Sequence, residues 1–125
     1  MILKPVQLGR QALDPETLAA DKKRCRPFGP CGAGEKALYL GGFWLDRRYY
    51  LPYSSIQRVF KRVAMSRGGF SRKGIFASLP YLVVQYDGGR EKQCLFKQEE
   101  QVDQLLDWLA QRRPEIKRAS ADAEA

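Results

Sequence analysis

One stretch, YLVVQYDGGREKQCLF at positions 81–96, constrains the fold more than any other part of the chain. Apolar residues alternate along its first half, with Leu82, Val84 and Tyr86 on one face. The DGG sequence that follows tolerates the positive backbone angles of a tight turn, and alternation resumes on the return through Cys94. This pattern predicts a β-hairpin with one buried face, so we expect the core to be built on an antiparallel sheet.

An amphipathic helix is predicted directly after this hairpin, from about Lys97 to Arg113. Its apolar residues recur at i, i+3, i+4 and i+7, which places them on one stripe that must pack against other elements. Acidic residues occupy the first turn and arginines the last, in agreement with the helix dipole, and Pro114 stops the helix. The stripe consists of Val102, Leu105, Leu106 and Leu109.

Three further segments before the hairpin are predicted as strands. KALYLGG at 36–42 places Leu38 and Leu40 on one face, and RYYLPYSSI at 48–56 is expected to end near Pro52, which cannot donate to a sheet ladder. In the third segment, 56–65, charged and apolar residues share both faces. We therefore expect that strand at or near a sheet edge, where lysine and arginine heads can reach water.

The first 34 residues are predicted to form an extension, because apolar residues are sparse there and prolines and glycines are frequent. Asp14 can cap a short helix that begins with Pro15 and ends near Lys23. The following basic run, which consists of Lys22, Lys23, Arg24 and Arg26, is interpreted as a solvated linker. Residues 27–34 are predicted to be a loop.

Residues 115–125 are predicted to be disordered, since the segment KRASADAEA lacks bulky apolar side chains. The predicted folded domain is therefore residues 35–114. A chain of 125 residues suits one such domain. No apolar run approaches the roughly 18 residues that cross a bilayer, and no signal-peptide core is apparent, so we expect a cytoplasmic protein.

The composition disfavours the commonest enzyme and metal sites. The chain contains no histidine, so it cannot pair a serine or cysteine nucleophile with the usual general base. Cys25, Cys31 and Cys94 are an odd number of thiols and offer neither a disulfide framework nor a common zinc set. We therefore expect no enzyme activity, no cofactor and no metal.

Charge provides the clearest functional pattern. The net charge is +8, and the segment RVFKRVAMSRGGFSRK at 58–73 carries six positive charges and no acidic residue. A basic strand that runs into a glycine-rich loop at 66–74 predicts a contact site for an acidic protein surface or an anionic head group. The loop lacks the Gly-Lys-Ser/Thr order of a nucleotide loop. The predicted contact residues are Arg58, Lys61, Arg62, Arg67, Phe70, Arg72 and Lys73.

Two other functions remain open at this point. Basic residues beside exposed aromatic side chains could bind nucleic acid, although no RNA-binding signature is present. The domain could equally be a plain scaffold that docks onto another protein.

From about Glu35 to Arg113 the chain resembles the pleckstrin-homology-like superfamily, including its GRAM and bacterial branches. The resemblance is carried by RYYLPYSSIQRV, by the hairpin at 81–96 and by the closing helix, in which Trp108 looks like the tryptophan that many such domains carry. It implies a mainly β fold, a bent antiparallel sheet or partly open barrel capped by one C-terminal amphipathic α-helix. The family usually has seven strands, whereas five or six are counted here, and the N-terminal segment is a candidate for supplying another.

Overall fold

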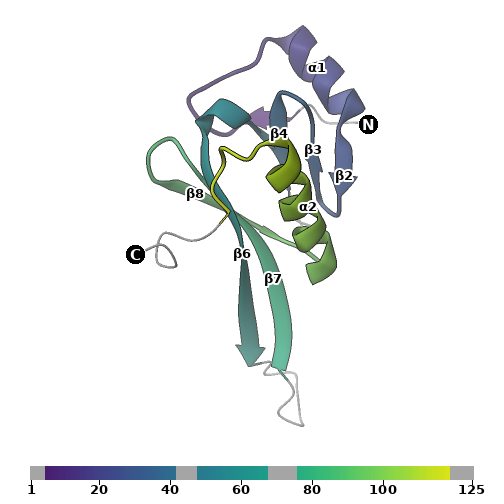
Figure 1. The fold of residues 1–125 in the computed structure, drawn as a ribbon, viewed down its shortest axis with the longest axis vertical. Coiled ribbons are helices and arrows are strands. Elements are labelled where there is room, and N and C mark those ends of the chain that lie inside the picture. The colour runs from purple at the N-terminus through teal and green to yellow at the C-terminus, as the bar shows by residue number, and fades with distance from the viewer. Residues whose placement is uncertain (1–4, 42–47, 68–75, 119–125) are drawn as a thin grey trace.

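The computed structural model describes residues 5–41, 48–67 and 76–118. In these parts the chain is mainly β, with two sheets and a C-terminal helix, and the sheets do not close into a barrel (Figure 1). The predicted mainly β fold with a C-terminal helix is confirmed. The elements in chain order are β1 (Val6–Gln7), α1 (Pro15–Arg24), β2 (Arg26–Phe28), β3 (Cys31–Ala33), β4 (Ala37–Leu40), β5 (Tyr49–Pro52), the 3-10 helix η1 (Tyr53–Ser55), β6 (Ile56–Arg67), β7 (Phe76–Tyr86), β8 (Arg90–Leu95) and α2 (Glu99–Arg112).

The first sheet has the order β1-β5-β4-β3-β2, in which β2 to β5 form an antiparallel meander and β1 runs parallel to β5. The prediction of a loop at 27–34 is wrong, because β2 and β3 form a hairpin that turns at Gly29 with a φ of 59°. Pro27 is tolerated because β2 is an edge strand, where a missing N–H breaks no ladder. Phe28 and Cys31 are buried in the main core, so the core includes part of the predicted extension.

The second sheet has the order β6-β7-β8. The predicted hairpin at 81–96 is confirmed, with positive φ values at Asp87, Gly88 and Gly89 in its turn. The basic strand β6 lies at an edge of this sheet, as predicted, but it continues through Ser66 and Arg67, which were expected in a loop. The rest of that predicted loop lies outside the described residues.

Beyond the end of β8, strands β6 and β7 continue as a two-stranded ribbon that extends away from the body of the protein (Figure 1). The last residue pair of β7 with β8 is Tyr81 with Leu95, whereas β6 and β7 remain paired to Arg67 and Phe76. Within the described part of the basic segment, the residues of β6 in this ribbon lie farthest from the core.

Helix α2 packs against β2, β6 and β7, so it contacts both sheets. Val102, Leu105 and Leu109 of its apolar stripe are buried, which confirms the predicted packing face. None of the helices in the described segments is long and apolar enough to span a membrane.

The segment after α2 does not match the prediction of a disordered tail at 115–125. Ile116 is only 1% exposed, and Lys117 forms a parallel bridge with Arg58 of β6. The prediction is therefore wrong for residues 115–118, because the apolar Ile116 side chain fills part of the core. Residues 119–125 lie outside the described part of the chain.

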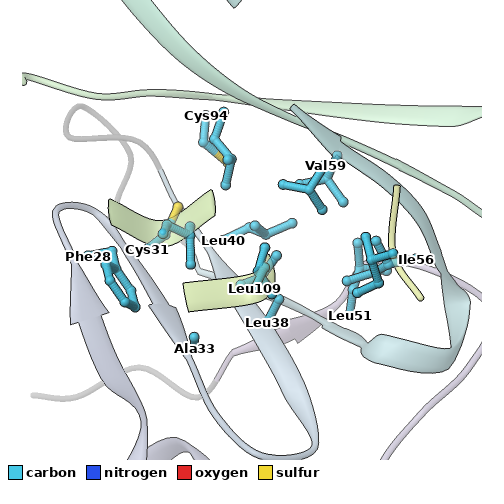
Figure 2. Close-up of a cluster of buried hydrophobic side chains, with 14 of the residues drawn as sticks. Phe28, Cys31, Ala33, Leu38, Leu40, Leu51, Ile56, Val59, Cys94 and Leu109 are labelled. Atoms are coloured by element: carbon cyan, nitrogen blue, oxygen red, sulfur yellow. The ribbon is translucent and has the colours of Figure 1, made fainter. Parts of the chain in front are cut away.

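The main core lies between the two sheets and is closed by α2 (Figure 2). A smaller cluster on the outer face of the first sheet contains Ala37, Tyr39 and Tyr50, against which Leu13 and Leu18 pack. These leucines come from α1 and the segment before it. The predicted short helix is thus confirmed, and it covers the outer face of the first sheet.

Candidate functional site

Lys61, one of the predicted contact residues, is engaged with α2 rather than with solvent alone. Its Nζ lies 3.0 Å from Glu99 Oε2 and 2.8 Å from Asp103 Oδ1. Glu99, an acidic residue of the first helical turn, therefore both complements the helix N-terminus and helps to neutralise this lysine. Hydrogen bonds to Asp103 and Glu99 raise the pKa of Lys61 above its usual value.

Arg62 points to the opposite face of the sheet, as strand alternation requires. Its Nη1 lies 3.4 Å from Glu91 Oε2, and its guanidinium carbon lies 5.6 Å from the centre of the Phe60 ring. Hydrogen bonds from Gln93 and Gln85, together with Arg62, hold the pKa of Glu91 below its usual value. The two adjacent basic residues thus do not form one anion-binding cluster, and each already has an acidic partner.

Of the other predicted contact residues, Arg58 and Arg67 lie on the described strand β6. Arg58 pairs in register with Lys117 and is engaged in an interaction within the protein. Arg67 ends β6 at the far end of the ribbon, opposite Phe76. The predicted contacts of Phe70, Arg72 and Lys73 lie outside the described residues, and their role stays a prediction.

The outer edge of β6 offers a different kind of binding surface, made of backbone groups. The Val59 N–H donates to the Lys117 carbonyl at 2.8 Å, and the Lys117 N–H donates to the Gln57 carbonyl at 3.2 Å. Because alternate residues of a strand direct their backbone groups to the same side, Lys61 and Val63 also present theirs to this edge. No described strand pairs with the edge beyond Val59.

The exposed part of this edge is also apolar at its centre. Val63 is 40% exposed. Among the described residues, Val6 is the other large hydrophobic residue that is exposed to this extent. An edge strand with unpaired backbone groups and an exposed valine is a ready template for an added strand. The mixed polarity of residues 56–65, which predicted an edge strand, was the sequence signal for this site.

Two exposed arginines, Arg26 and Arg112, lie over the rings of the buried Phe28 and the half-buried Trp108 where β2 and α2 meet, and we call this site the arginine–aromatic surface. The rings of Phe28 and Trp108 lie edge to face, with centres 6.3 Å apart and planes at 63°. The Arg26 guanidinium carbon lies 5.3 Å from the Phe28 ring centre, and that of Arg112 lies 5.5 Å from the Trp108 ring centre. Trp108 is partly exposed and packs against the main core. Sequence reasoning missed the surface, because Arg26 was placed in a linker.

An open depression between α1 and the start of β4 has a volume of about 220 Å³. The carboxylate of Asp21 lines it but is fully engaged, since it accepts from the backbone N–H groups of Glu35, Lys36 and Ala37 and from the Tyr39 hydroxyl. A side chain at Gly34 would collide with this carboxylate, which explains the glycine there. Asp21 therefore holds α1 on the sheet and has no capacity left for a ligand.

Two of the three thiols are buried in the core, and the third, Cys25, is half-buried. Cys31 and Cys94 are each 1% exposed in the core (Figure 2), and Cys31 Sγ donates to the Gly41 carbonyl at 3.5 Å. Burial raises the pKa of Cys31 well above its usual value, which suppresses the reactive thiolate. In the described segments, no group of three or more cysteine and acidic side chains could hold a metal ion.

No protein family model matches the chain, and no curated protein or solved structure matches it. Function is therefore inferred from the geometry of the chain itself. The two surfaces that remain are the outer edge of β6 and the arginine–aromatic surface between β2 and α2.

Proposed function

We propose that this protein is a non-enzymatic binding module that holds an extended, acidic segment of a partner protein along the outer edge of β6. The observation that carries the proposal is the addition of the chain's own Lys117 to that edge through two backbone hydrogen bonds. Strand addition of this kind draws affinity from main-chain hydrogen bonds and specificity from flanking side chains. The part of the edge that pairs with no described strand runs from Lys61 to Arg67, directly after the residues that bond to Lys117.

Charge supports an acidic partner rather than a second copy of the chain. Between Lys61 and Arg67 the strand has three basic residues and no acidic one. Two copies paired edge to edge would bring these like charges together, which destabilises a strand pair. Lys61 and Arg62 already have acidic neighbours, so we assign the attraction mainly to Arg67 and the predicted contacts Arg72 and Lys73.

We also propose a relationship to the pleckstrin-homology-like superfamily. What supports it is the element order, in which a four-strand antiparallel meander (β2 to β5) precedes a three-strand meander (β6 to β8) and one helix. That arrangement supplies the seven strands that such domains usually have. The N-terminal hairpin β2–β3 provides the strands that were missing from the sequence-based count.

A photo-cross-linking residue placed at Val63 in the native cell tests the proposed function, with the same residue at the exposed Gln104 of α2 as the matched control. We expect a protein adduct at Val63 and none at Gln104. The cross-linked segment of the partner should be rich in acidic residues and should be extended rather than helical. Combining the probe with Arg67→Glu and Arg72→Glu should reduce the adduct at least severalfold. No adduct at Val63, or an adduct with nucleic acid or lipid, would overturn the proposal.

A further inference from the structure

The arginine–aromatic surface lies where the edge strand β2 runs beside α2 (Figure 1). Strand alternation places Arg26 on the same side of β2 as Phe28, and one helical turn places Arg112 beside Trp108. The edge-to-face contact between the two rings joins these pairs into one continuous arrangement. Its two ends are guanidinium groups, and both arginines are exposed.

A cation–π contact with a ring does not use the N–H donors of a guanidinium in hydrogen bonds. Those donors match the two oxygens of a carboxylate. Neither Arg26 nor Arg112 forms an ion pair with an acidic residue in the segments that the structure covers. Both groups are therefore held in place with their donors available, which lowers the entropy lost when a ligand binds.

We propose that Arg26 and Arg112 form a binding site for an acidic peptide that offers two carboxylates, one to each arginine. A peptide is favoured over single-stranded nucleic acid because the arginines already cover the ring faces on which bases would stack. Lys23 and Arg24, at the end of α1 just before β2, add positive charge that attracts such a segment. Engagement of both arginines by one peptide makes the second contact intramolecular, so the pair binds far more tightly than either alone.

This site is independent of the β6 edge. Glu99 and Asp103, which neutralise Lys61, lie in the N-terminal half of α2, whereas Arg112 is its last residue. The two proposals can therefore fail separately, since each is tested with substitutions that leave the other surface unchanged.

Trp108 lies in the site and provides the readout. In a Trp44→Phe background, Trp108 is the sole tryptophan of the chain. We expect its fluorescence to change saturably on titration with a short glutamate-rich peptide at low salt. Arg26→Gln and Arg112→Gln should each weaken binding by about tenfold or more, because each removes a bidentate charge-assisted contact.

Two matched variants separate a specific site from general basicity. Arg24→Gln removes the same charge two residues from Arg26 and should change the affinity less than about threefold, because Arg24 is not part of the proposed pair of arginines. Arg26→Lys keeps the charge but loses the planar donor pair, and it should weaken binding nearly as much as Arg26→Gln. Thermal melting of each variant checks that these exposed substitutions leave the fold intact.

Several results would overturn the inference. The first is the absence of a saturable Trp108 signal with the peptide. The second is an equal loss of affinity in Arg24→Gln and Arg26→Gln, which would reduce the site to general charge attraction. The third is tighter, Arg26-dependent binding of a single-stranded oligonucleotide than of the acidic peptide, which would assign the surface to nucleic acid.

Discussion

Tyr39 of β4 donates its hydroxyl to the carboxylate of Asp21 of α1 at 2.7 Å, inside the protein. The same carboxylate accepts three backbone N–H groups from residues 35–37, at 2.8 to 3.2 Å. An aspartate that is only 7% exposed is tolerated because these four donors replace its water. The pair therefore fixes the N-terminal helix on the outer face of the first sheet.

Replacing Asp21 with alanine should lower the free energy of unfolding by about 2–4 kcal/mol, since it leaves several donors without an acceptor. Tyr39→Phe removes one donor and should cost about 1 kcal/mol. Urea denaturation followed by circular dichroism measures both. The exposed Glu16 of the same helix is the control, and Glu16→Ala should change stability by less than about 0.5 kcal/mol. Equal losses of stability in Asp21→Ala and Glu16→Ala would refute the conclusion that Asp21 fixes α1 on the first sheet.

Alkaline pH should destabilise the protein through Tyr39. Burial, followed by the hydrogen bond to Asp21, raises the pKa of Tyr39 above its usual value of 10.0, and burial raises the pKa of Tyr53 in the same direction. The unfolded chain releases these phenolic protons near pH 10, whereas the folded protein retains them. Raising the pH above 10 therefore lowers the free energy of the unfolded state relative to the folded state. The contribution of these two tyrosines to stability should be fully present below about pH 10 and should be lost as the pH rises beyond it.

Urea unfolding at a series of pH values between about 8 and 11 measures this dependence. Tyr39→Phe should show a shallower decline above pH 10, because one of the titrating groups is gone. Parallel curves for the variant and the wild type would show that Tyr39 does not contribute to the alkaline loss.

The elements with strong periodicity could be predicted from the sequence, because each has a single apolar face. The hairpin at 81–96 and helix α2 were recognised by the alternation through Val84 and the stripe through Leu105. The hairpin of β2 and β3 could not, since each strand has three residues and Pro27 lies in the first. Short strands acquire their identity from pairing, which the local sequence does not encode.

The candidate site was harder to predict because charge in a sequence does not reveal its partners. The prediction of an edge strand was correct, yet the acidic residues that face Lys61 come from a helix 38 residues or more along the chain. The opposite error occurred at Arg26, which was interpreted as a solvated linker residue. It lies on strand β2, where its guanidinium contacts the Phe28 ring. The first error concerns a contact with a distant helix, and the second concerns a short strand that is defined by its pairing with β3. The composition of a segment reveals neither.

Ile116 should contribute substantially to stability although it follows the last helix. It is 1% exposed and packs in the main core, so Ile116→Ala should lower the free energy of unfolding by about 2–5 kcal/mol. A chain that ends at Pro114 should lose at least as much, because it also loses the hydrogen bonds of Lys117 to β6. A chain that ends at Arg118 keeps these contacts and is the control. Similar stabilities for all three chains would contradict the observed packing of this segment.

The ion pairs of Lys61 should contribute little to stability. The Lys61 side chain is 29% exposed, and those of its partners Glu99 and Asp103 are 45% and 49% exposed. Exposed pairs are screened by water and salt, so Lys61→Met should lower the free energy of unfolding by at most about 1 kcal/mol. The loss should shrink further in about 1 M salt, where the Debye length falls to about 3 Å.

The same substitution also tests where the charge of β6 acts. If the acidic partners neutralise Lys61, Lys61→Met should reduce partner cross-linking at Val63 less than the double change Arg67→Glu with Arg72→Glu. The variant Asp103→Asn should act in the opposite direction, since it releases part of the Lys61 charge and should increase the adduct at low salt. A larger loss from Lys61→Met than from the double reversal would assign the attraction to Lys61 and not to Arg67 and Arg72.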